Sequence, residues 1–339
     1  MRLARTTAAA ALATTLLLSA AACSDSSDDG TDGSGSGSLE RVEYLTSFGN
    51  FGRDAYAWVA REKGYFREAG LEVEIKPGNA TAENLKMIAA GQAAFSPLDL
   101  TGLLLAAGQG QAKDVVAVAA IQQKTMAAIM SLEGNGIAVP KDLEGKTLAD
   151  SPSSVVRNLF PTYAKLAAID ASKVKWVNGT PQTLIGTLAG GGVQGIGQFV
   201  VGKPTVEAAA KGRKAVVLPY SDVMRDLYGN VLVTSKKIAT EQPDLAKRFT
   251  AALLKGLEYS IANPAEAGEI LHRNVPAAAA APAAAELELM AAYVTSEIGV
   301  GGIDLGRVAG SIALLETAGS IPPGVTPEQI VDASLTPKR

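Results

Sequence analysis

The chain has 339 residues, 47% of them hydrophobic, with 31 Lys and Arg against 34 Asp and Glu. This length predicts two domains or one large one, and the apolar fraction is enough to bury two cores. The formal net charge of −3 and the scattered Lys and Arg argue against a nucleic-acid partner.

The N-terminus has the layout of a secretion signal. Arg2 and Arg5 give a positive start, residues 8–18 form an apolar run, and small residues precede Cys23. Cys23 is the single cysteine of the chain, so it cannot form an internal disulfide. The arrangement resembles the lipobox of bacterial lipoproteins, although Ala20 stands where that box usually has a larger aliphatic residue. We predict a signal peptide that ends at a lipidated Cys23, the alternative being a plain signal peptide with Cys23 incidental.

A polar segment follows, from Ser24 to Ser38, and contains no apolar residue. Such a segment cannot bury enough surface to offset its loss of chain entropy, so residues 24–38 are predicted to be a flexible tether behind a membrane anchor. No later run reaches the roughly 18 apolar residues that span a bilayer. We therefore expect an extracytoplasmic domain that is soluble apart from its lipid anchor on the outer face of the cell membrane.

From Leu39 onward, short apolar runs alternate with helical patterns. The predicted strands are residues 41–47, 71–75, 93–95, 115–121, 127–132, 146–150, 173–177, 193–199, 215–220 and 230–235. This alternation predicts an α/β fold with mainly parallel sheets. Gly64 and Gly91 are expected as left-handed ends of helices, and Gly70 as a turn into the next strand.

Three predicted strands run into Ser or Thr, then Pro, then a helical pattern. Ser96, Ser151 and Thr180 are therefore expected as N-caps, each followed by Pro at the first helical position. The free N–H groups of such helices point toward the carboxyl ends of the strands, where α/β sheets bind ligands. Capping alone is the alternative interpretation, but Ser153 and Ser154 exceed what a cap requires.

Groups for catalysis are scarce. His272 is the only histidine and lies in a polar helical stretch, so neither a Cys–His pair nor a Ser-His-Asp triad can be assembled. The glycine-rich run at 190–197 follows a helix and is interpreted as a helix-ending turn rather than a nucleotide loop. We expect no enzyme activity, no metal site and no cofactor.

Four segments together resemble a known family in their order and spacing: "EKGYFREAGLEVEI", "ENLKMIAAGQAAFSP", "PKDLEGKTLAD" and "KGLEYSIANPAEAGEIL". They are similar to the extracytoplasmic substrate-binding proteins of ABC importers, in the branch that contains binders of nitrate, sulfonates and the pyrimidine precursor of thiamine. The resemblance extends from about Val42 to Leu335. It implies a small-molecule solute, permease and ATPase partners, and a monomeric binding protein.

The resemblance also implies a type II periplasmic-binding-protein-like fold, with two Rossmann-like lobes that close on a solute held in the cleft between them. Crossings between the lobes are expected near 133–140 and 220–230. Lobe 1 would then comprise residues 39–134 and 230–339, and lobe 2 residues 135–229.

Candidate ligand residues are the side chains in the strand-to-helix loops of both predicted lobes. In lobe 1 they are Phe48, Asn50, Phe51, Arg53, Tyr56, Asn79, Ser96, Asp99, Gln122 and Gln123. In lobe 2 they are Ser151, Ser153, Ser154, Thr180, Gln198, Phe199 and Tyr220. Two aromatics on the glycine-flanked "SFGNFG" loop would suit stacking on a planar ring, or would anchor the loop on its own lobe. Arg53 and Asp54 could equally be a surface ion pair.

The ligand stays open at this point. Ala94 and Gln194 stand where family members commonly carry Asp, so no particular ligand carries over. The loop aromatics favour a pyrimidine-like heterocycle, whereas the serine cluster would suit a sulfonate-like or carboxylate anion. Alternative roles are a cytosolic enzyme of pyrimidine synthesis with the same fold, or a ligand sensor. The leader and the single histidine argue against the enzyme.

Overall fold

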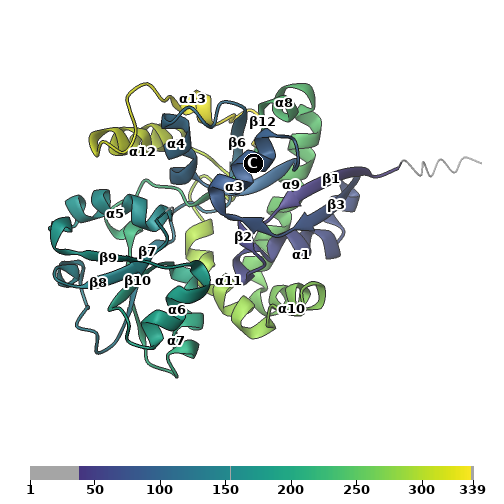
Figure 1. Ribbon diagram of the computed structural model, residues 1–339. Helices are drawn as coiled ribbons and strands as arrows, with labels where there is room; N and C mark the ends of the chain where they lie inside the picture. Colours follow the sequence, from purple (N-terminus) through teal and green to yellow (C-terminus); the bar gives the residue numbers. More distant parts are fainter. Residues whose placement is uncertain (1–37, 153, 337–339) are drawn as a thin grey trace, which may run out of the picture. The chain divides into compact units, whose positions relative to one another are not determined.

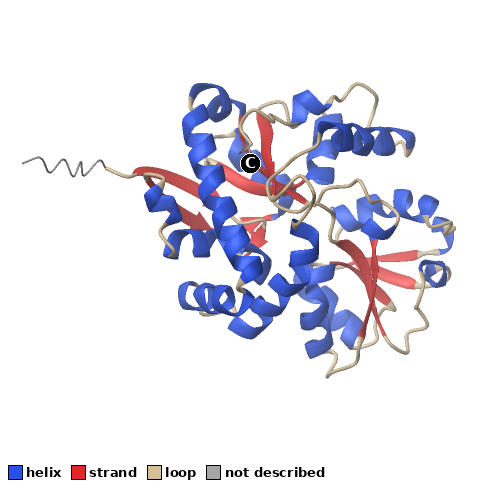
Figure 2. Cartoon of the chain, turned by 180° about the vertical axis from the view of Figure 1, so that it is seen from behind, coloured by secondary structure: helices blue, strands red, loops and turns tan. Residues whose placement is uncertain are grey.

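Two mixed five-stranded sheets organise the protein in a computed structural model that describes residues 38–152 and 154–336 (Figure 1). The signal peptide predicted at 1–23 with Cys23, the tether residues 24–37, and Ser153 lie outside the described residues. The two sets of strands are separate in the view from behind (Figure 2).

The first sheet has the strand order β3-β1-β5-β12-β6. Its strands are β1 (Glu40–Leu45), β3 (Leu71–Lys76), β5 (Phe95–Asp99), β6 (Val115–Ala120) and β12 (Asn230–Ser235). β1 is parallel to β3 and β5, and β12 is antiparallel to β5 and β6. All six residues of β6 are buried, which accounts for its continuous apolar run.

The second sheet has the order β11-β7-β10-β8-β9. Its strands are β7 (Ala127–Leu132), β8 (Thr147–Asp150), β9 (Lys175–Asn178), β10 (Gly195–Phe199) and β11 (Ala215–Pro219). β8 is parallel to β9 and β10, whereas β7 is antiparallel to β10 and β11. The α/β fold class is confirmed, and all ten predicted strands contribute to these sheets. The expectation of mainly parallel sheets needs the correction that β7 and β12 run against their neighbours.

The helices connect these strands and cover the sheets. They are α1 (Tyr56–Glu62), α2 (Tyr65–Glu68), α3 (Ala80–Ala89), α4 (Leu100–Gly108), α5 (Val155–Leu166), α6 (Pro181–Ala189), α7 (Lys203–Ala209), α8 (Lys236–Glu241), α9 (Pro243–Ala262), α10 (Pro264–Asn274), α11 (Ala280–Val294), α12 (Leu305–Thr317) and α13 (Pro327–Ile330). Short 3-10 turns occur at η1 (Gly52–Asp54), η2 (Pro140–Leu143), η3 (Ala171–Lys173), η4 (Val200–Gly202) and η5 (Tyr220–Asp222). Within the described ranges, no helix is long and apolar enough to cross a membrane.

A cluster of aromatic rings holds α9 and α2 on the first sheet. The ring of Phe249 in α9 lies 4.0 Å from that of Phe95 and 5.2 Å from that of Phe66, measured between centroids. Phe66 belongs to the "GYF" segment, so that segment is part of the core of the first sheet. Gly64 and Gly91 are left-handed as predicted, with φ of 81° and 70°, and Gly70, predicted as a turn, is also left-handed, with φ of 76°.

Two of the three predicted caps are wrong. Ser96 and the proline after it belong to β5, and α4 begins only at Leu100, capped by the Asp99 carboxylate. Proline fits there because β1 pairs with β5 only at Phe95. Likewise α5 begins at Val155 with Ser154 as its cap, three residues after Ser151. The cap of α6 at Thr180 is as predicted.

The chain passes between the sheets twice, from β6 to β7 and from β11 to β12. The predicted boundary at 134 would leave β7 with lobe 1, whereas β7 pairs with β10 and β11 of the second sheet. The division into lobes stays a prediction, and this pairing moves its first boundary to residues 121–126. A two-stranded ribbon of β2 (Phe48–Gly49) and β4 (Gly78–Asn79) was not predicted.

Candidate ligand-binding site

The loop after β1 is fixed by buried hydrogen bonds. Asp54 is only 1% exposed and accepts hydrogen bonds from the Ser47 N–H at 2.9 Å and from the Ser47 hydroxyl at 2.7 Å. The Thr46 hydroxyl accepts from the Gly78 N–H at 2.9 Å, and Asn84 of α3 donates to the Thr46 carbonyl at 2.8 Å. These contacts hold the loop at the carboxyl edge of the first sheet. Arg53 and Asp54 do form an ion pair, but it is buried and not at the surface, because Asp54 is buried and the Arg53 side chain is only 12% exposed.

Aromatic side chains surround a guanidinium at this edge. The rings of Phe48 and Phe51 are almost parallel, at 2° with centroids 6.2 Å apart, and Phe51 is 41% exposed. The Arg53 guanidinium carbon lies 4.5 Å from the centroid of Phe51 and 5.9 Å from that of Phe199. Phe199 ends β10, so Arg53 connects the carboxyl edges of the two sheets.

Two buried carboxylates compensate Arg53. Its Nε lies 3.8 Å from Asp54 Oδ2, and its backbone N–H donates to Glu286 of α11 at 3.1 Å. Burial raises the pKa of both Asp54 and Glu286, and the charge of Arg53 opposes that rise. The positive charge of Arg53 is therefore already balanced within the protein.

A third buried carboxylate, that of Asp150, lies at the carboxyl edge of the second sheet. Asp150 ends β8 and is 3% exposed. Its Oδ1 accepts the Ser151 N–H at 2.7 Å, but Oδ2 has no hydrogen-bond partner among the described residues. Burial raises the pKa of Asp150. The Ser154 hydroxyl, the Ser151 N–H and the charge of Arg157 each oppose that rise. This edge thus presents an acceptor that the fold leaves unused.

Arg157 of α5 is held by neighbours in the second sheet. Its Nη1 donates to Asn178 Oδ1 at 2.7 Å, and its guanidinium carbon lies 5.3 Å from the ring centroid of Trp176. The Ser154 hydroxyl accepts the Val156 N–H at 3.1 Å and so caps the same helix. Ser154 and Arg157, at the start of α5, are therefore already engaged in contacts within the protein.

Comparison with known proteins places the chain in a family. A family profile described as NMT1/THI5 like matches residues 55–267. The chain belongs to this NMT1/THI5-like family. Family membership agrees with the resemblance stated from the sequence motifs, which is thereby confirmed.

Two curated relatives carry names of solute-binding proteins. A riboflavin-binding protein from Chloroflexus aurantiacus is 26% identical over 65% of this chain and 62% of its own length. A formylaminopyrimidine-binding protein from Halalkalibacterium halodurans is 25% identical over 70% of this chain and 71% of its own length. The chain thus spans less than two thirds of the first relative.

A solved structure with the same fold is the periplasmic aliphatic sulphonate binding protein from Escherichia coli. It superposes with a TM-score of 0.69 at 14% identity, over 90% of this chain and 94% of that protein. This likeness concerns the fold alone. It confirms the predicted type II periplasmic-binding-protein architecture.

The predicted site residues of this family member fall into two groups. Ten are exposed or half-buried near the carboxyl edges of the two sheets: Phe48, Asn50, Phe51, Arg53, Asn79, Ser151, Ser154, Thr180, Gln198 and Phe199. Their role as ligand contacts stays a prediction. Sequence reasoning missed Glu286, Asp150, Arg157 and Asn178, although Asp150 ends a predicted strand directly before a predicted site residue.

The other six described residues are buried and their polar groups serve the fold. The Tyr56 hydroxyl accepts from that of Tyr44, the Ser96 hydroxyl accepts from Asn84, and Asp99 caps α4. Gln122 accepts the Asn230 N–H, Gln123 donates to the Gly302 carbonyl, and Tyr220 donates to the Val156 carbonyl. Each therefore has a structural role, and ligand contact by any of them stays a prediction.

Asp99 gives a first testable prediction. Burial raises its pKa to about 6, above the ordinary value of 3.8. The unfolded chain therefore releases a proton that the folded chain keeps, so the stability contributed by this group is lost as pH rises from 4 through 6. Asp99→Asn keeps the capping oxygen, so its free energy of unfolding at pH 7 should exceed that of the original chain by about 1–3 kcal/mol.

Urea unfolding at pH 4 and pH 7 measures this difference. The gain should be small at pH 4, where the carboxyl is protonated in the folded chain. A variant that is equally destabilised at both pH values would show that Asp99 is ionised in the folded protein and that its charge favours the cap.

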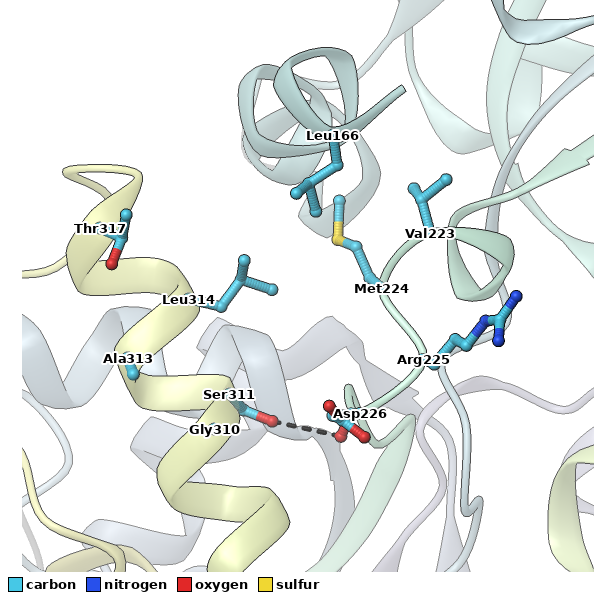
Figure 3. A pocket seen from close by; sticks show the side chains of 10 residues that line it. All are labelled: Leu166, Val223, Met224, Arg225, Asp226, Gly310, Ser311, Ala313, Leu314 and Thr317. Carbon is cyan, nitrogen blue, oxygen red and sulfur yellow. Dashed lines mark hydrogen bonds between the residues drawn. The ribbon is translucent and has the colours of Figure 1, made fainter. Parts of the chain in front are cut away.

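Two hollows border the segments that connect the two sheets. One, of about 350 Å³, is lined by Leu166, Val223, Met224, Leu314 and neighbouring residues of α5, α12 and residues 223–226 (Figure 3). In the same view Ser311 of α12 donates to the backbone carbonyl of Asp226. A second hollow, of about 510 Å³, is lined by residues that include Lys124, Asp222 and Tyr293. Neither contains a predicted site residue.

Proposed function

We propose that the protein is the solute-binding component of an ABC importer, which holds a small planar polar solute between the carboxyl edges of its two sheets and delivers it to a permease and its ATPase. The observation that carries this proposal is that Arg53 contacts both Phe51, in the loop after β1 of the first sheet, and Phe199, at the end of β10 in the second sheet. Aromatic pairs contribute about 0.5–1.5 kcal/mol beyond burial, and a flat ring could take part in the same stack. The names of the two curated relatives, for riboflavin and for a formylaminopyrimidine, support a heterocycle.

A sulfonate or similar anion is the second candidate solute. The capped start of α5, with Ser154 and Arg157, favours it because helix N-termini attract negative charge. The name of the sulphonate-binding protein with the same fold supports this candidate. Measured affinities for both classes will separate the two candidates.

We propose binding rather than catalysis as the activity of this chain. Its single histidine, His272, is exposed in the last turn of α10, and its Nδ1 lies 2.9 Å from the Ala278 carbonyl oxygen. An enzyme of the same fold and a ligand sensor are the alternatives. We further propose an extracytoplasmic location, with Cys23 as the lipid anchor, and a monomer that closes on its solute.

Calorimetric titration of the purified full chain with riboflavin, an aminopyrimidine, an alkanesulfonate and nitrate tests the function. We expect micromolar binding of a heterocycle, which corresponds to about 8 kcal/mol. Free solute at one hundred times its dissociation constant should then add about 2.7 kcal/mol to the free energy of unfolding. Absence of binding by all four probes to a folded chain would contradict the proposed solute classes. Turnover of a bound probe would favour the enzyme.

A further inference from the structure

Asp150 is kept at the carboxyl edge of the second sheet by a neighbouring glycine. β8 and β10 pair in parallel, with Ala149 opposite Ile196, so Asp150 lies beside Gly197. A Cβ atom on Gly197 would lie 2.0 Å from Asp150 Oδ2 and 2.4 Å from its Cγ. The carboxylate therefore has room only because residue 197 has no side chain.

The two oxygens of Asp150 differ in what they contact. Oδ1 accepts the Ser151 N–H, whereas Oδ2 is buried and has no hydrogen-bond partner within the described part of the chain. A buried acceptor without a partner is unfavourable for the folded chain. Its retention at the edge where α/β sheets bind ligands indicates that a ligand supplies the missing donor.

The charge around both edges favours such a ligand over an anion. Arg53 is balanced by Asp54 and Glu286, and Arg157 is engaged with Asn178 and Trp176. Among these five residues, the carboxylates of Asp54, Glu286 and Asp150 outnumber the guanidinium groups of Arg53 and Arg157. Beside Asp150 a sulfonate would meet a carboxylate, and the neighbouring Arg157 is already engaged, while a nitrogen-bound hydrogen would be attracted.

We propose that Asp150 is a specificity-determining residue, whose Oδ2 accepts a hydrogen bond from an amino or ring N–H group of the solute and thereby selects nitrogen heterocycles over sulfonates. This inference rests on the proposed solute-binding function and names the solute class of the same site. Asp150→Asn tests it, because Asn keeps the oxygen that accepts the Ser151 N–H and can place an N–H₂ donor where Oδ2 lies.

The experiment is calorimetric titration of the full chain, of D150N and of D304N with 4-amino-2-methylpyrimidine, riboflavin and butanesulfonate. Asp304 caps α12 by accepting hydrogen bonds from the Gly306 and Arg307 N–H groups. D304N therefore removes one negative charge, as D150N does, but from a residue outside the proposed site. We expect D150N to bind the heterocycles at least tenfold more weakly and to bind butanesulfonate no worse than the original chain. D304N should match the original chain with every probe.

A second comparison needs no variant and so does not depend on the folding of D150N. The original chain should bind 4-amino-2-methylpyrimidine at least tenfold more tightly than 2,4-dimethylpyrimidine, which lacks the amino group. Equal binding of these two, equal binding by D150N, or a preference for butanesulfonate would overturn the role of Asp150 while leaving solute binding established. Failure of the original chain to bind any probe would remove the proposed function and this inference together.

Discussion

Replacement of Phe249 by alanine should lower the free energy of unfolding by about 3–5 kcal/mol. Phe249 is fully buried in α9, and its ring contacts those of Phe95, Phe66 and Tyr44 at centroid distances of 4.0, 5.2 and 5.7 Å. The backbone around it cannot collapse into the space left, because Gly256 already brings α9 into close contact with α1. A Cβ on Gly256 would lie 2.4 Å from the Tyr56 carbonyl oxygen.

Phe51→Ala is the matched control, since it removes the same side chain from a position that is 41% exposed. Urea unfolding followed by circular dichroism should show a loss of less than about 1 kcal/mol for this variant, in line with the smaller burial. Equal losses for the two variants would mean that the ring cluster around Phe249 does not stabilise the first sheet.

The strands were predictable from the sequence because their signal is local. The continuous apolar run of β6 and the alternation of buried and exposed residues in β3 are properties of consecutive residues. The direction of β7, by contrast, could not be predicted from local sequence. The direction of β7 depends on which strand it pairs with after the chain passes to the second sheet, and the residues "AAIMSL" do not determine that partner.

Helix starts show how local rules compete. Ser-Pro satisfies the pattern of a cap and first helical position at both 96 and 151, but Asp99 and Ser154 cap the helices instead. At Ser96 the pairing of β5 with β12 continues the strand to Asp99. The pattern was correct at Thr180, where β9 ends two residues before the helix cap.

The candidate site was partly predictable for the same reason. The aromatic loop and Arg53 follow a predicted strand, so their place at a carboxyl edge could be inferred. Glu286 comes from α11, more than two hundred residues later in the chain, and its hydrogen bond with the Arg53 N–H depends on tertiary packing. Asp150 was not predicted as a site residue because it was assigned to a strand. The last residue of a strand nevertheless lies at the carboxyl edge of its sheet.

Arg53 gives the second large effect. Arg53→Met keeps an unbranched apolar side chain and removes the guanidinium, in a position where the Arg53 side chain is only 12% exposed. Asp54 and Glu286 then stay buried without a compensating charge, and removal of one partner of a buried ion pair costs about 3–5 kcal/mol. We expect a loss near the lower end at pH 7, because the Nε to Oδ2 distance is 3.8 Å.

The dependence of this loss on pH separates charge from packing. Burial already raises the pKa of Asp54 and Glu286, and Arg53 holds both values down, so its removal raises them further. A raised pKa in the folded chain means that stability is lost as pH rises, so the variant should lose more stability at pH 7 than at pH 5. Adding Glu286→Gln should restore part of the stability at pH 7, since only one of the two buried carboxylates then remains without its guanidinium partner. An equal loss at both pH values, with no rescue by Glu286→Gln, would instead assign the effect of Arg53 to its contacts with the rings of Phe51 and Phe199.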